Sequence, residues 1–181
     1  MNKKTKFVTR TAIFIALLLV LQFSTASMGQ YVTGSVVNFI LIAACLTAGI
    51  PSGVVVAFLS PFFAKMFGIG PALIQIVPAI AVANVVYVLS YGLFGKVKCK
   101  KYKYVLWIIF VLAGAFLKYI VLNLLVTKVV LVFSTVPSPM VAKLTAMFGV
   151  NQLITALIGG ILAMIIVPVV KRGIDKRNIQ E

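Results

Sequence analysis

Apolar residues fall into six long runs along the chain, separated by short stretches that contain glycine, proline or basic residues. An apolar helix needs about 20 residues to cross a hydrocarbon layer about 30 Å thick. The pattern therefore predicts an all-α integral membrane protein whose residues 1–181 form one transmembrane domain, a compact bundle of six helices. The expected spans are residues 10–27, 36–49, 52–66, 71–95, 104–128 and 147–170.

The connections between the runs are short. Residues 24–35 are polar and contain Gly29 and Gly34, both helix breakers, so we expect an outer loop there. Residues 49–53 read Gly-Ile-Pro-Ser-Gly and predict a turn. Residues 129–145 form the longest outer connection, which has room for a short helix in the membrane interface.

Composition and charge support the membrane assignment. The chain is 62% hydrophobic and only 10% charged, which excludes a soluble globular domain. Its net charge is +15, and most of the basic residues lie in three clusters, at residues 3–10, 96–103 and 171–177. Because short basic loops stay in the cytoplasm, we expect both termini and the central loop there. The first run also resembles a secretory signal, but its cleavage would leave an odd number of spans.

Lys118 places a charge inside the fifth apolar run. At 1.5 Å per residue it lies about 21 Å beyond Tyr104, in the outer half of a layer about 30 Å thick. A lysine in a membrane helix costs about 3 kcal/mol at the centre, and such a residue is by default a candidate for function. The alternative is that its side chain extends to the outer surface.

The other polar residues form a pattern when they are sorted by depth. Most lie at the outer ends of spans, and the fourth span adds Asn84, Tyr87 and Tyr91 on one helical face. Because unpaired polar groups in lipid are costly, the pattern predicts a polar cavity that opens outward and has an apolar floor. Alternatively, the amides are interfacial or link helices, and the tyrosines pack. The outer set is Gln22, Ser35, Asn38, Gln75, Asn123, Asn151, Gln152 and Thr155.

The residues required for several kinds of chemistry are missing. Asp175 and Glu181 are the only acids and there is no histidine, so proton coupling is not expected. Residues 92–96 lack the spacing of a phosphate-binding loop, and no catalytic constellation is present. We therefore expect neither an enzyme nor an ATPase. Cys45 and Cys99 predict no disulfide, and we expect no metal, no cofactor and no nucleic acid as a partner.

A bundle that takes up a solute without an energy source of its own needs a partner. The basic N-terminus that leads into Thr-Ala-Ile-Phe-Ile-Ala at residues 11–16, the turn at 49–53 and Gly-Ile-Gly-Pro at 68–71 resemble the S component of an energy-coupling factor (ECF) vitamin transporter. The resemblance implies a bacterial plasma-membrane complex with a transmembrane coupling subunit and two cytoplasmic ATPases. It also implies that Ala12 and Ala16 pack against the coupling subunit, and that the S component topples in the membrane to deliver its vitamin.

The resemblance further implies a site formed by the first outer loop and spans four to six. Its predicted residues are Gln30, Tyr31, Asn84, Tyr87, Lys118, Tyr119, Asn123 and Asn151. Hydroxymethylpyrimidine or a vitamin B6 compound such as pyridoxine is the expected ligand, and a pantothenate-type acid is an alternative that also suits the lysine. A permanently cationic ligand such as thiamine is disfavoured because no acid is available to pair with it. A membrane scaffold that binds no small molecule remains an alternative, whereas a self-sufficient facilitator should have polar inner halves.

Overall fold

The computed structural model of the protein describes residues 2–71, 73–94, 103–132 and 138–178, and these residues are almost entirely helical. They form seven α-helices and two single 3-10 turns and contain no strand. The expected all-α fold is confirmed. The elements are α1 (Lys3–Thr25), η1 (Ala26–Met28), α2 (Gln30–Ala48), α3 (Ile50–Met66), η2 (Ile74–Ile76), α4 (Val77–Phe94), α5 (Lys103–Val132), α6 (Ser138–Phe148) and α7 (Val150–Asn178).

Each of the six expected spans overlaps an apolar helix of the described chain. The third corresponds to α3, which has 17 residues and reaches about 26 Å at 1.5 Å per residue. The other five coincide with segments of the described chain that are long and apolar enough to cross a membrane. These segments are Lys3–Met28, Gln30–Ala48, Ile74–Leu93, Val105–Lys128 and Leu144–Gly173.

Three glycines with positive φ lie at helix ends. Gly29 (φ 87°) separates η1 from α2, Gly49 (φ 104°) separates α2 from α3, and Gly68 (φ 71°) follows α3. Glycine adopts these backbone angles without the strain that a side chain would add. The chain therefore reverses direction within very few residues, and the turn expected at residues 49–53 is reduced to Gly49.

The outer loop expected over residues 24–35 is wrong for most of its length. Helix α1 continues to Thr25 and α2 begins at Gln30, so only η1 and Gly29 connect them. Gly34, which was expected to break a helix, lies inside α2, where an added Cβ would come within 3.0 Å of the Thr155 side chain on α7. Its small size serves close contact between two helices rather than a break.

Two other expectations concern residues 96–103 and 129–145, which the structure describes only in part. The short helix expected within residues 129–145 is present as α6, which begins at Ser138, while residues 133–137 lie outside the described part. The basic cluster at residues 96–103, together with Cys99, lies outside the described side chains. Cys45 is buried in α2.

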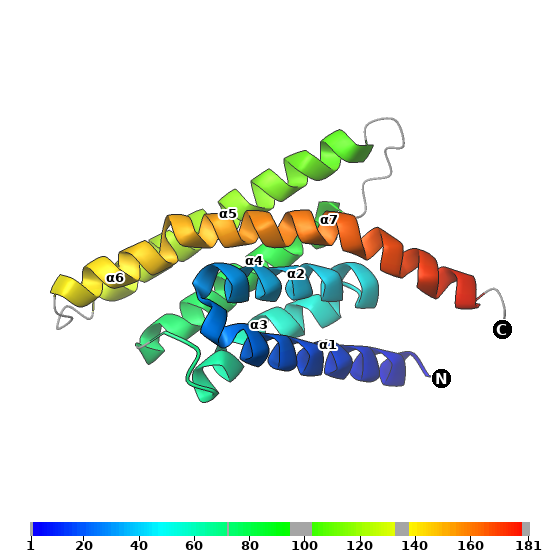
Figure 1. The fold of residues 1–181 in the computed structure, drawn as a ribbon, viewed down its shortest axis with the longest axis horizontal. Helices are drawn as coiled ribbons and strands as arrows, with labels where there is room; N and C mark the ends of the chain where they lie inside the picture. The colour runs from blue at the N-terminus through cyan, green and yellow to red at the C-terminus, as the bar shows by residue number, and fades with distance from the viewer. Residues whose placement is uncertain (1, 72, 95–102, 133–137, 179–181) are drawn as a thin grey trace.

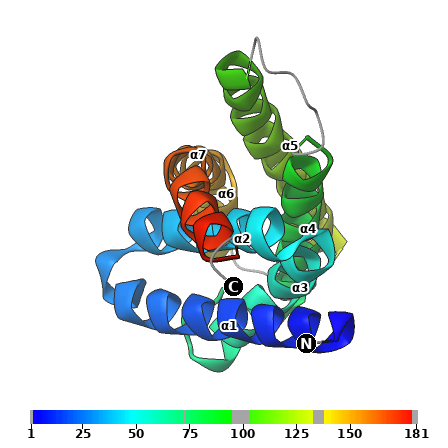
Figure 2. The ribbon, with the colours of Figure 1, turned by 90° about the vertical axis from the view of Figure 1, so that its right-hand side faces the viewer.

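Helix α2 lies in the middle of the bundle. It packs against α7 on one side and contacts α1, α3 and α4, and Figure 2 shows it between α1 and α7. Successive long helices run in opposite directions, so both termini lie at one end of the bundle and α6 lies at the other (Figure 1). The start of α1 and the end of α7 thus lie at the same end of the bundle, and the cytoplasmic location of that end stays a prediction.

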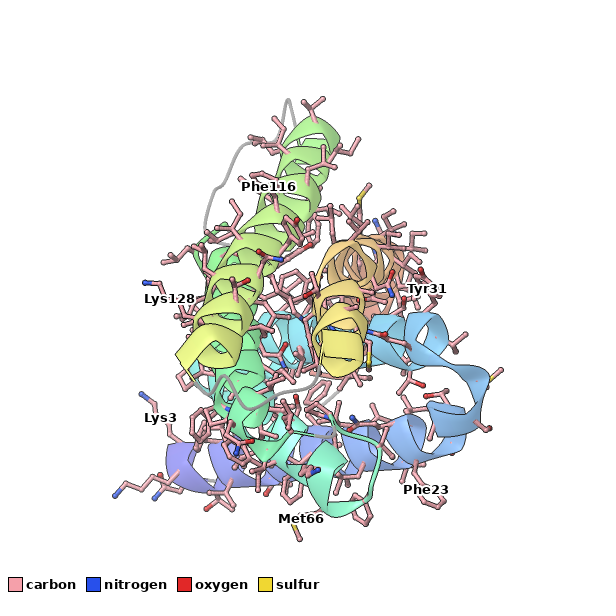
Figure 3. All side chains as sticks on the ribbon, turned by 90° about the vertical axis from the view of Figure 1, so that its left-hand side faces the viewer. Lys3, Phe23, Tyr31, Met66, Phe116 and Lys128 are labelled. Carbon is pink, nitrogen blue, oxygen red and sulfur yellow. The ribbon has the colours of Figure 1, made fainter. Side chains whose placement is uncertain are left out.

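The outer surface of the bundle is apolar. Large exposed side chains include Phe23, Met66 and Phe116, which point away from the helices in Figure 3. The N-terminal half of α5 stands away from the other helices (Figures 1 and 2) and exposes Val105 and Leu112 among others. A surface with this many large exposed apolar side chains suits lipid and not water. The protein is a multi-pass membrane protein.

Candidate functional site

A cavity of about 290 Å³ lies at the end of the bundle opposite to the termini. Its wall includes Gly29 and Gln30 at the start of α2, residues 69–71 between α3 and η2, and Met147 and Phe148 at the end of α6. Figure 3 views the molecule from this end. Six helices, α1 to α5 and α7, supply the polar part of the wall. The polar lining residues are Gln22, Gln30, Thr33, Asn38, Ser60, Asn84, Lys118 and Gln152.

Lys118 on α5 is the charged residue of this wall. Its side chain is only 2% exposed, and its Nζ donates a hydrogen bond of 2.5 Å to Oδ1 of Asn38 on α2. The same Nζ lies 5.1 Å from the centroid of the Tyr87 ring, a distance typical of a cation–π contact. These partners are neutral, and the sequence contains no acidic residue before Asp175. The site therefore holds a lysine whose described contacts supply no counter-charge.

The partner of Lys118 is itself fixed by α7. Asn38 Nδ2 donates to Oγ1 of Thr155 at 3.3 Å. One turn further along α7, a Cβ added to Gly159 would lie 2.6 Å from Cβ of Asn38 and 2.9 Å from the backbone oxygen of Ser35. The backbones of α2 and α7 approach this closely only because residue 159 is glycine. The approach places the amide of Asn38 between Thr155 and Lys118.

Two amide side chains in the wall keep an oxygen without a hydrogen-bond partner among the described residues. Asn84 on α4 is 2% exposed and donates from Nδ2 to Oγ of Ser60 on α3 at 3.1 Å, while its Oδ1 is unpaired. Gln22 on α1 is 7% exposed, and its Oε1 is also unpaired. Buried polar atoms are nearly always paired in folded proteins. The described part of the wall therefore contains two unpaired acceptor oxygens and one lysine amine.

The start of α2 is bonded to the segment around the start of α7 beside the cavity. Gln30 Nε2 donates to the carbonyl oxygen of Met147 at 2.7 Å, and the Tyr31 hydroxyl donates to Oδ1 of Asn151 at 2.8 Å. The first of these bonds lies in the cavity wall, and the second is on the exposed side of α2. Together they connect α2 to the end of α6 and the start of α7, which lie more than 100 residues later in the sequence.

Beyond Lys118, toward the termini, the interior is filled by apolar packing. Tyr87 donates its hydroxyl to the carbonyl of Ala156 at 2.6 Å, and its ring meets the Tyr91 ring edge-to-face with centroids 5.1 Å apart. Around these rings pack Ile42, Ala43, Val111, Ala115, Ala156, Ala163 and Val167. This packing agrees with the apolar floor expected from the sequence.

The structure brings three of the predicted site residues into the cavity wall: Gln30, Asn84 and Lys118. Tyr87 lies directly beneath Lys118. Tyr31 and Asn151 bond to each other outside the lining, and Tyr119 and Asn123 on α5 also lie outside it. Direct contact of any of these residues with a ligand stays a prediction.

Other lining residues were not chosen from the sequence. Gln22, Asn38 and Gln152 belong to the outer polar set, but nothing in the sequence distinguished them from interfacial amides. Ser60 and Phe148 gave no signal, because a serine next to proline and a phenylalanine in an apolar run are common in membrane helices. Their positions depend on how α3 and α6 pack against the other helices.

The two alanines predicted to contact a partner lie on the outer face of α1. Ala12 and Ala16 are exposed, whereas Thr11 and Leu18 on the opposite face are buried. Thr11 donates to Oγ of Ser52 at 2.8 Å, which fixes the rotation of α1 against α3. The small residues at i and i+4 therefore form a shallow strip that is open to a neighbouring helix.

The fold and the cavity define a small helical membrane protein with a polar site that is reached from one end and closed toward the other by apolar packing. Residues 6–171 match the family described as ECF transporter, substrate-specific component, and the chain belongs to this family. No curated protein and no solved structure matches the chain. It is accordingly a substrate-binding component for a small molecule within an ECF transporter, and not a catalytic subunit.

Proposed function

We propose that the protein captures a small water-soluble vitamin or vitamin precursor outside a bacterial plasma membrane and delivers it through a coupling subunit and two cytoplasmic ATPases. The main support is the position of Lys118, a buried lysine in the wall of a small polar cavity whose described partners are neutral. A buried cation of this kind is a strong donor for an electron-rich or anionic ligand atom. The apolar packing beyond it explains the need for partner subunits.

The size of the cavity limits the ligand. Ligand sites typically occupy about 300–1,000 Å³, and this cavity, at about 290 Å³, lies at the lower end. Such a volume favours one small substituted ring over fused rings with a long side chain. Hydroxymethylpyrimidine and vitamin B6 compounds such as pyridoxine meet this requirement, and they are the ligands that we propose.

The aromatic partner for such a ring is Phe148 rather than a tyrosine. Phe148 lines the cavity, whereas the Tyr87 ring is covered by the ammonium group of Lys118. Offset or edge-to-face contact of a heteroaromatic ring with Phe148 would add to the hydrogen bonds of the polar wall. Lys118 would then donate to a ring nitrogen, a hydroxyl oxygen or a phenolate.

A pantothenate-type acid is the second candidate. Its carboxylate would form a charge-assisted hydrogen bond with Lys118, and its hydroxyl groups would meet the amides of the wall. The absence of acidic residues before Asp175 continues to disfavour a permanent cation such as thiamine.

The coupling subunit is proposed to dock on the strip formed by Ala12 and Ala16. Both residues are exposed and follow one another at i and i+4 on α1, a spacing that lets two membrane helices approach closely. The cavity lies on other faces of the bundle, so docking and ligand capture use separate surfaces.

Native mass spectrometry of the gently purified chain tests the proposed function. We expect a bound adduct with the mass of a small vitamin, which identifies the ligand directly. If the chain remains bare after exposure to a panel containing pyridoxine, hydroxymethylpyrimidine and pantothenate, vitamin capture is contradicted and a scaffold role is favoured.

A further inference from the structure

We infer that Gln22 and Asn84 select the ligand by accepting two hydrogen bonds from it, so that the ligand is a compact compound with at least two hydroxyl or amine donors and one acceptor for Lys118. This inference rests on the proposed function and narrows its substrate class.

Asn84 is held in one orientation. Its Nδ2 is used by Ser60 on the neighbouring α3, which leaves Oδ1 as the free end of a side chain that is 2% exposed and belongs to the cavity wall. An amide oxygen has no hydrogen to donate. It therefore recognises only a ligand group that brings its own hydrogen.

Gln22, on another helix, also has an amide oxygen without a hydrogen-bond partner in the described part of the chain. Gln22 lines the cavity and is 7% exposed, and its Oε1 has no hydrogen-bond partner among the described residues. Because Gln22 is on α1 and Asn84 is on α4, the two unpaired oxygens belong to different helices of the cavity wall. Two separate donor groups on the ligand are needed to pair with them.

Lys118 imposes the opposite requirement. An ammonium group donates hydrogen bonds and accepts none, so the ligand must also present an electron-rich atom. Pyridoxine, with three hydroxyls and a ring nitrogen, satisfies all three residues, as does hydroxymethylpyrimidine, with an amine, a hydroxyl and ring nitrogens. A compound whose polar atoms are all acceptors would leave both amide oxygens buried and unpaired, which is unfavourable. Sites of this type reject analogues without the donor far more strongly than apolar pockets reject a missing methylene group.

The first test changes the ligand and leaves the protein intact. Isothermal titration calorimetry of the wild-type protein compares pyridoxine with derivatives in which each hydroxyl in turn is replaced by hydrogen. It also compares 4-amino-5-hydroxymethyl-2-methylpyrimidine with its deamino and 5-methyl analogues. For the parent compound that binds, we expect removal of either of two donor groups to weaken binding about 10- to 100-fold.

The second test changes the protein. Asn84→Leu and Gln22→Met remove the acceptors at similar volume, and Gln75→Met is a matched control because Gln75 is exposed and lies outside the lining. In at least one of the two acceptor variants, the parent compound and its donor-deleted analogue should bind equally, since the interaction that distinguishes them is gone. The control should retain the full difference.

The outcomes separate this inference from the proposed function. If the parent compound binds and its donor-deleted analogues bind as tightly, ligand capture stands and the selection by Gln22 and Asn84 is overturned. The same conclusion follows if the compound identified by native mass spectrometry has fewer than two donor groups. If no compound binds and no ligand co-purifies, the proposed function and the inference both fail.

Discussion

Lys118 of α5 donates a hydrogen bond of 2.5 Å to Asn38 of α2, a residue 80 positions earlier in the chain. Asn38 in turn donates to Thr155 of α7. Three helices thus meet in one short polar chain beside the cavity. These hydrogen bonds hold α2, α5 and α7 together and also set the direction in which the ammonium group of Lys118 points.

Replacement of Lys118 by methionine should abolish most of the ligand affinity. The side chain keeps its length but loses a charge-assisted donor, which contributes about 1.5–3 kcal/mol, so the dissociation constant should rise at least 10-fold. Isothermal titration calorimetry measures this change. Lys128→Met is the control, because Lys128 is exposed on the same helix (Figure 3) and should bind ligand as the wild type does. Unchanged affinity in well-folded Lys118→Met protein would show that the site is misplaced.

Asn38→Leu should destabilise the bundle through Lys118. The substitution removes the partner of a buried cation, and we expect a loss of about 1–3 kcal/mol in the free energy of unfolding. Adding Lys118→Met should recover part of this loss, since the cation that lacks a partner is then gone. Chemical unfolding of the single and double variants in detergent measures the coupling. Strict additivity would mean that the two residues do not interact.

Gly159→Ala should weaken both folding and binding. The new methyl group would lie 2.6 Å from Cβ of Asn38 and 2.9 Å from the backbone of α2, so the helices must separate. Overpacking of this kind costs about 1–3 kcal/mol, and the shift displaces Asn38 from Lys118. Gly173→Ala on the same helix is the control, because its Cβ would meet nothing within 4 Å. Equal melting temperatures for the two variants would rule out the close approach of α2 and α7.

Tyr31→Phe should accelerate ligand release without abolishing binding. The lost hydroxyl joins the start of α2 to Asn151 at the start of α7, beside the cavity. A hydrogen bond of this kind contributes about 0.5–1.5 kcal/mol, so we expect dissociation to be about 2- to 10-fold faster. Stopped-flow displacement of the bound ligand measures the rate. A rate equal to that of the wild type would show that this contact does not restrain the site.

Simultaneous replacement of Ala12 and Ala16 by leucine should prevent assembly with the coupling subunit and leave ligand affinity unchanged. Both side chains point away from the bundle, so the larger residues block close helix contact without disturbing the interior. Co-purification with the partner subunits tests assembly, and calorimetry on the isolated chain tests affinity. Ala113→Leu on the exposed face of α5 is a control for added bulk at the lipid surface. Normal assembly of the double variant would exclude this strip as the docking surface.

Three of the residues predicted for the site line the cavity, and each was chosen for a different reason. Lys118 was selected by its depth in the fifth span, Asn84 by its place on a polar face of the fourth span, and Gln30 through the family resemblance; all three line the cavity. The depth of a residue in the membrane does not specify the face of the helix on which its side chain lies. Asn123 lies at the same level as other outer polar residues, but at 100° per residue it is about 140° around α5 from Lys118. Helical geometry alone therefore places the two side chains on different faces.

The hydrogen bonds between side chains on different helices could not be predicted from one sequence. Asn84 and Tyr87 share a face of α4, yet Asn84 reaches Ser60 while Tyr87 reaches Ala156 on α7. The choice of Asn38 as the partner of Lys118 depends on the contact at Gly159, which follows from the crossing of α2 and α7. Neither a hydropathy profile nor the spacing of residues along one helix records that crossing.

The neutral surroundings of Lys118 have an electrical consequence. A protonated Lys118 is a charge held inside the bilayer without a carboxylate partner among its described contacts. Any reorientation of the bundle in the membrane then moves that charge through part of the electric field, at about 2.3 kcal/mol per elementary charge for each 100 mV crossed. If the bundle reorients with a neutral ligand bound, the movement of this charge would be electrogenic and would respond to membrane voltage. With an anionic ligand bound, the charge of the ligand would cancel the contribution of Lys118 to this voltage dependence.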